Sequence, residues 1–118
     1  KDPERVSKDA AFANLGEEYA VNSRRHYYAN VTFIDDQIGQ IIQILKEKGM
    51  YENAIICYTA DHGDMLGDHY HWRKTYAYEG SAKIPYIIKW PSAMTTQAIR
   101  GKRIEQPVEL RDFLPYLH

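Results

Sequence analysis

The segment at residues 58–74, YTADHGDMLGDHYHWRK, decides how the rest of this sequence is interpreted. It continues an apolar run, AIICY at residues 54–58, whose length and β-branched content predict a buried strand. Asp61, His62 and Gly63 follow where that strand ends. In an open α/β sheet, ligands bind just past the carboxyl ends of the strands. The segment therefore predicts that Asp61 and His62 belong to a functional site.

Residues 61–74 carry more charge than a core tolerates and an unusual density of imidazole, and two interpretations fit them. In the first, the segment is a polar loop whose charges lie in water. In the second, Asp61 and His62 bind a metal ion and a nearby cationic side chain binds an anionic substrate. A carboxylate suits hard cations, and an imidazole suits zinc or manganese. Spacing alone leaves both interpretations open.

A longer series of motifs, in a fixed order, resembles the sulfatase family, whose arylsulfatase-like members belong to the alkaline-phosphatase-like superfamily. The similarity covers roughly residues 24–91, and so many ordered matches are far more specific than a lone short motif. The matching motifs are YYA at 27–29, IDDQIG at 34–39, DHGDMLGDH at 61–69, Trp72, Lys74, YEG at 78–80, IP at 84–85, YIIKWP at 86–91 and DFLP at 112–115.

The resemblance implies an α/β fold that forms part of an alkaline-phosphatase-like sheet with flanking helices. We expect residues 1–118 to be the C-terminal portion of a sulfatase catalytic domain, incomplete at both ends. Sulfatases use a formylglycine made from the Cys or Ser that opens a Cys/Ser-x-Pro/Ala-x-Arg motif. Cys57 and the four serines do not open such a motif. The nucleophile is therefore expected outside this segment, and the segment alone is not expected to hydrolyse sulfate esters.

The resemblance also assigns roles to individual residues. Asp61 and His62 match metal ligands, and the family's usual ion is Ca²⁺, although an imidazole ligand makes Mn²⁺ or Zn²⁺ an alternative. Lys74 matches the catalytic lysine that contacts the sulfate oxygens. His69 keeps the family's Gly-Asp-His pattern and is a candidate for substrate binding. A loop-structuring role is the alternative for both His69 and His71.

The implied function is that of a sulfuric ester hydrolase, a metal-dependent sulfatase acting on a sulfate ester substrate. Related folds hydrolyse phosphonate monoesters or phosphodiesters with much the same pattern of aspartate, histidine and lysine. The third alternative is a non-catalytic fragment that only binds a metal ion or a partner chain. The expected partner is the remainder of the sulfatase chain. The resemblance favours a periplasmic or secreted location.

Composition excludes several other classes of protein. The net charge of −1 predicts no general attraction to nucleic acid or to membranes. No run approaches the roughly 20 apolar residues of a membrane span. The single cysteine, Cys57, excludes an internal disulfide bond and leaves the compartment open. Its place in the apolar strand predicts a small buried side chain.

The remaining pattern predicts one long helix and two strands. The helix is expected to begin after Asn22 or Ser23 and to end before Gly49, with one apolar stripe formed by Tyr27, Val31, Ile34, Ile38, Ile41, Ile42 and Leu45. Strands are expected at residues 54–59 and 84–90, as parallel neighbours that need cover on both faces. A short strand at 102–104 and the start of a helix at 108–118 complete the expectation.

Overall fold

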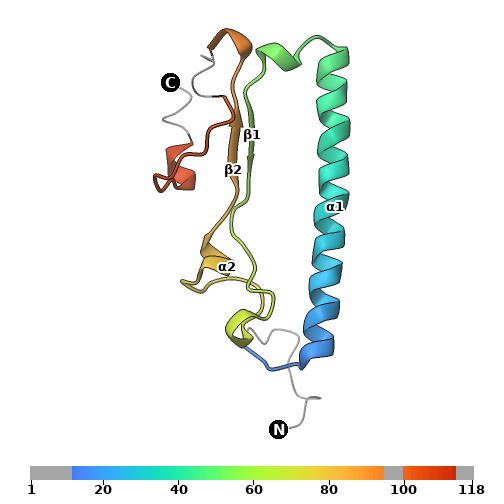
Figure 1. Ribbon diagram of the computed structural model, residues 1–118, viewed down its shortest axis with the longest axis vertical. Coiled ribbons are helices and arrows are strands. Elements are labelled where there is room, and N and C mark those ends of the chain that lie inside the picture. The colour runs from blue at the N-terminus through green and yellow to red at the C-terminus, as the bar shows by residue number, and fades with distance from the viewer. Residues whose placement is uncertain (1–11, 95–99, 114–118) are drawn as a thin grey trace.

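The computed structural model describes residues 12–94 and 100–113. This part of the chain is an α/β structure that combines helices with a small sheet (Figure 1). The longer elements are α1 (Glu17–Glu47), β1 (Ile56–Thr59), α2 (Glu79–Ala82) and β2 (Tyr86–Lys89). Short 3₁₀ turns lie at Tyr51–Asn53, Asp68–Tyr70, Ser92–Met94 and Leu110–Asp112.

Helix α1 begins earlier than the sequence pattern predicted and ends where it predicted. The expected start at Asn22 or Ser23 was wrong, because the helix starts at Glu17, directly after Gly16 with φ of +85°. Two glutamates in the first turn suit the positive end of the helix dipole, which favours this earlier start. At the other end, Gly49 has φ of +66° and its N–H donates to the Lys46 carbonyl at 3.0 Å. The glycine therefore terminates the helix as predicted.

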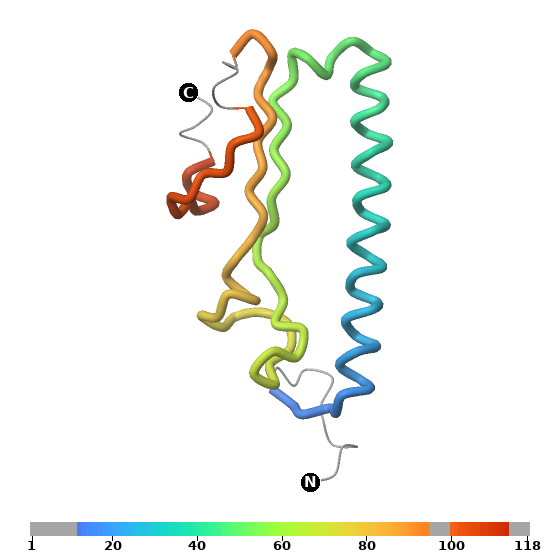
Figure 2. The backbone as a smooth tube through the Cα atoms, viewed as in Figure 1, coloured from blue at the N-terminus to red at the C-terminus, as the bar shows by residue number. Residues whose placement is uncertain are grey.

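The apolar stripe of α1 is exposed within the described part of the chain. No residue of α1 is buried, and Ile34 and Ile41 keep 48% and 58% of their surface. Figure 2 shows the helix running alongside the two strands. Its side-chain contacts with the rest of the described chain lie toward its ends, where Arg24 reaches the loop after β1 and Lys46 lies 5.2 Å from the ring centre of Tyr51.

Strands β1 and β2 pair antiparallel, which corrects the prediction of parallel neighbours. Ile56 lies opposite Lys89, and Thr59 lies opposite Tyr86. A parallel pair needs a crossover connection, which is usually an α-helix, whereas the only α-helix between β1 and β2 is the four-residue α2. The last residue of β1 and the first residue of β2 therefore lie at the same end of the sheet. Cys57, opposite Ile88, is half-buried rather than buried.

The C-terminal part differs from the prediction in two more respects. Residues 102–104 form no strand. Instead of a regular helix start, Leu110–Asp112 forms a 3₁₀ turn, in which the Glu109 N–H donates to Asp112 Oδ2 at 2.8 Å. The rest of the predicted helix, residues 114–118, lies outside the described residues. None of the helices in the described ranges has the length and apolar character needed to cross a bilayer.

Two of the few buried residues of the described chain belong to the connection between the two strands. Met65 is 2% exposed and Ser81 is 5% exposed. In the same connection, the backbone of Gly63 passes so close to Gly80 that an added Cβ would lie 2.1 Å from the Gly80 carbonyl oxygen. Only glycine fits such an approach without moving the backbone.

Replacing Gly63 by alanine should therefore destabilise the protein by at least the roughly 1–3 kcal/mol that overpacking a tight site costs. Gly39→Ala is the matched control, because an added Cβ there meets nothing within 4 Å in the described structure. That change lies inside α1 and should raise stability by roughly 0.5–1 kcal/mol. Chemical denaturation of both variants measures the difference, and a Gly63→Ala variant as stable as the unmodified protein would contradict the close approach.

Candidate functional site

Three of the predicted site residues meet just beyond the end of β1. Lys74 Nζ lies 2.6 Å from His62 Nε2, and Asp61 Oδ2 lies 3.4 Å from the same nitrogen. The His62 side chain is 37% exposed and the Asp61 side chain is 81% exposed. The group therefore opens to the surface, where a ligand can reach it.

The partners of His62 fix the position of its proton. His62 Nδ1 lies 2.7 Å from the Gly63 carbonyl oxygen, which can only accept, so Nδ1 carries the proton and donates it. The Lys74 ammonium can only donate, so Nε2 accepts with its lone pair. The contact with Asp61 is consequently not an ion pair, since that would need a second proton on Nε2. A ring nitrogen that donates to a backbone carbonyl while the other keeps its lone pair is the arrangement of a metal-binding histidine.

The geometry of Asp61 and His62 fits a divalent cation. Two ligand atoms about 2.4 Å from a calcium ion and at right angles to each other lie about 3.4 Å apart. The separation of Asp61 Oδ2 from His62 Nε2 is 3.4 Å, and the Lys74 ammonium stands in for a cation beside them. Within residues 12–94 and 100–113, no group of three or more His, Cys, Asp and Glu side chains converges on one point. Asp61 and His62 therefore bring two potential donor atoms together without a third from the described residues.

A ladder of backbone hydrogen bonds folds the connection between the strands back on itself and carries Lys74 to His62. The N–H of Gly63 donates to the Ser81 carbonyl at 2.8 Å, and that of Met65 donates to the Arg73 carbonyl at 2.7 Å. At the tip, the Gly67 N–H donates to the His71 carbonyl at 2.8 Å. Residues 63–81 therefore form a compact loop around the buried Met65, and we call it the site loop.

Several residues of the site loop have strained backbone conformations. Five of its non-glycine residues have positive φ, a conformation that is uncommon outside glycine and concentrates at functional sites. Two of them flank the lysine, since φ is +66° at Arg73 and +88° at Thr75. The other three are Leu66, His69 and Tyr70. The backbone around Lys74 thus takes a form that only specific contacts can maintain.

His69 and His71 lie among aromatic rings rather than beside Lys74. The His69 ring stacks on Tyr78 with centroids 4.6 Å apart. The His71 ring lies 3.9 Å from the Tyr76 ring and 4.9 Å from the Phe12 ring. These contacts agree with the loop-structuring role, and substrate binding by His69 stays a prediction.

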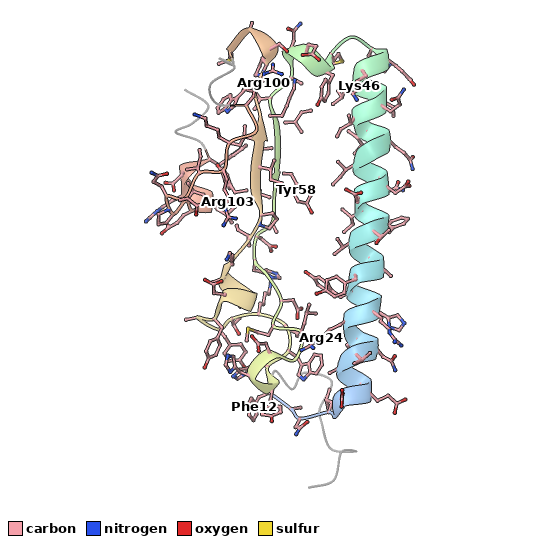
Figure 3. All side chains as sticks on the ribbon, viewed as in Figure 1. Phe12, Arg24, Lys46, Tyr58, Arg100 and Arg103 are labelled. Atoms are coloured by element: carbon pink, nitrogen blue, oxygen red, sulfur yellow. The ribbon has the colours of Figure 1, made fainter. Side chains whose placement is uncertain are left out.

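Contacts with α1 and with the segment before it hold the site loop in place. Arg24 on α1 points toward the loop and its Nε–H donates to the Leu66 carbonyl at 2.9 Å, while Phe12 lies beside the loop (Figure 3). Trp72 donates its Nε1–H to the Ala13 carbonyl at 2.9 Å and meets the Tyr19 ring edge-on with centroids 5.6 Å apart. The aromatic residue two positions before Lys74 is therefore an anchor of the loop.

One residue that joins the two ends of the site loop, Ser81, was not predicted from the sequence. Ser81 Oγ accepts the Thr75 N–H at 3.1 Å, and the Ser81 carbonyl accepts the Gly63 N–H at 2.8 Å. Both of these partners are backbone N–H groups. A pattern of side chains does not reveal such contacts, so Ser81 was a candidate only for the formylglycine precursor.

Comparison with known proteins identifies the family of this chain. The family model described as Sulfatase matches residues 2–117. The chain is 43% identical over 91 residues to an arylsulfatase from Clostridium perfringens, which covers 77% of this chain and 19% of that protein. It is 40% identical over 86 residues to a choline-sulfatase from Rhizobium meliloti, covering 73% of this chain and 17% of that protein.

Among solved structures, the chain is similar to a predicted sulfatase, yidJ, from Bacteroides fragilis. The TM-score is 0.62 at 36% sequence identity, over 77% of this chain and 20% of that one. The chain thus spans about a fifth of the length of the relatives that it matches. Since the family model covers nearly all of the sequence and the solved structure shares its fold, the chain belongs to the sulfatase family.

Proposed function

We propose that the protein containing this chain is a sulfuric ester hydrolase that uses a divalent cation and a formylglycine nucleophile, the latter outside these 118 residues. The observation that carries the proposal is the convergence of Asp61, His62 and Lys74 at the end of β1. A sulfate ester gathers negative charge on its oxygens as it reacts, and an anionic group needs cationic partners held in fixed places. Similarity to an arylsulfatase and a choline-sulfatase supports this substrate class.

Asp61 and His62 would hold the cation together with acidic residues outside the chain. Calcium is the proposed ion, and the imidazole ligand keeps manganese and zinc as alternatives. A bound divalent cation would neutralise charge on the sulfate oxygens. Asp61 supplies an anionic oxygen, and His62 supplies the lone pair that its contact with Gly63 leaves free.

Lys74 is the proposed catalytic residue of this segment. Its ammonium group lies 2.6 Å from His62 Nε2, so a sulfate oxygen bound next to the cation would be near it. An ammonium fixed in that place stabilises developing negative charge without waiting for water to reorganise. The site loop fixes the backbone on both sides of the lysine.

The substrate class is tested by comparing esters of different acids. The intact protein, loaded with calcium, should hydrolyse 4-nitrophenyl sulfate with a higher kcat/KM than either 4-nitrophenyl phenylphosphonate or bis(4-nitrophenyl) phosphate. A preference for the phosphonate or the phosphodiester would assign the protein to the other hydrolases of the superfamily. Calcium binding without turnover of any of the three esters would indicate a metal-binding protein that is not an enzyme.

Asp61→Asn should weaken metal binding, because a neutral amide replaces an anionic ligand. We expect affinity to fall by more than the roughly 10–100-fold that loss of an outer-shell partner causes. Asp35→Asn, on the exposed surface of α1, removes the same charge and should leave the affinity unchanged. Calorimetric titration of the intact protein with calcium and, separately, with manganese measures both variants and identifies the preferred ion. An Asp61→Asn variant with undiminished affinity for both ions refutes the assignment of this ligand.

Lys74→Ala in the intact enzyme should lower kcat/KM for a sulfate ester by roughly 10²–10³-fold, the scale for removing one preorganised charge-stabilising donor. The metal content should not fall, because a protonated lysine is not a metal ligand. Lys83→Ala is the matched control, since the Lys83 side chain is 70% exposed and pairs with Glu79 at 3.1 Å. Near-normal kinetics of the Lys74 variant would remove the lysine from the mechanism, and loss of metal would point to a structural role.

A further inference from the structure

We propose that Ser81 is a positioning residue that holds Lys74 in its working place, an inference that rests on the proposed function of Lys74. Ser81 lies on α2 and is buried, with 5% of its surface exposed. Its hydroxyl oxygen accepts the N–H of Thr75, the residue directly after Lys74. Its action on the sulfate site would therefore pass through the backbone of the site loop.

Ser81 links the two segments of the chain that carry His62 and Lys74. Its carbonyl accepts the N–H of Gly63, the residue after His62, at 2.8 Å. Its hydroxyl holds Thr75 at 3.1 Å, and its own N–H donates to the Tyr78 carbonyl at 3.0 Å, which fixes the serine on the turn of α2. One buried residue thus sets the metal-ligand end of the loop through its backbone and the lysine end through its side chain.

The lysine end needs such an anchor because its backbone is strained. Positive φ at Arg73 and Thr75 is maintained only where the surroundings over-determine the conformation. Without the hydroxyl, the part-buried Thr75 N–H would lose this acceptor, and a donor left without a partner disfavours the native conformation. Since the Lys74 side chain is long and exposed, the position of its backbone decides where its ammonium can reach.

Ser81→Ala separates the two functions of the residue, because it removes the hydroxyl and leaves the carbonyl in place. In the intact enzyme we expect kcat/KM for 4-nitrophenyl sulfate to fall by roughly 10–100-fold, the cost of a displacement on the order of 1 Å at a reacting centre. Calcium affinity should stay unchanged, because Gly63 and the neighbouring His62 keep their anchor. Ser92→Ala, at an exposed serine that bonds Glu52, is the control and should change neither quantity.

A double-mutant cycle distinguishes positioning of Lys74 from a general contribution to folding. In a Lys74→Ala background, adding Ser81→Ala should lower kcat/KM by less than twofold, because the residue on which Ser81 acts is already gone. A further loss of tenfold or more in that background, or a matching loss of calcium affinity, would overturn the proposal in favour of a merely structural role. Normal kcat/KM of Ser81→Ala in the otherwise unmodified enzyme would overturn it as well.

A spectroscopic measurement tests the same link without relying on turnover. In the metal-free protein labelled with ¹⁵N-histidine, Lys74→Ala should shift the His62 Nε2 resonance, because the bond from the ammonium is lost. Ser81→Ala should shift that resonance in the same direction, while Ser92→Ala should not. An unchanged resonance in Ser81→Ala overturns the positioning role. This result stands apart from the proposed function, which the comparison of the three ester substrates tests separately.

Discussion

The antiparallel pairing of β1 with β2 is the constraint on which the site depends. It brings Thr59 and Tyr86 side by side, so the chain between them must leave and return at the same end of the sheet. The bond from the Gly63 N–H to the Ser81 carbonyl continues this pairing beyond the strands. Because both ends of the site loop are fixed there, residues twelve positions apart, His62 and Lys74, meet in space.

The loop holds its shape through hydrogen bonds and two buried side chains, Met65 and Ser81, rather than through a large core. Met65 fills its centre, and the bonds from Met65 to Arg73 and from Gly67 to His71 hold its two sides together. A buried hydrogen bond contributes roughly 0.5–1.5 kcal/mol, and a residue at positive φ costs on the order of 1–3 kcal/mol. Loss of a single bond is therefore enough to let a strained residue relax, which is why individual contacts matter for the position of Lys74.

The same features orient the imidazole of His62. The Gly63 carbonyl binds the proton of Nδ1 and leaves the lone pair of Nε2 beside the Asp61 carboxylate. Gly63 thus acts through its lack of a side chain, which allows the close approach to Gly80, and through its carbonyl, which orients the imidazole. A substitution at Gly63 would therefore disturb both the fold of the loop and the orientation of the His62 imidazole.

The sequence by itself determined the family, the end of α1 at Gly49, the approximate places of both strands and the residues Asp61, His62 and Lys74 as site candidates. These features depend on residue type and local spacing, which a sequence displays directly. Only the tertiary structure decided that the strands are antiparallel, that the α1 stripe is exposed in the described chain, and that Lys74 contacts His62. It also decided the proton position on His62 and the link from Ser81 to Thr75. Each of these depends on backbone groups brought together across long stretches of chain, and a backbone N–H or carbonyl is the same at nearly every position of a sequence.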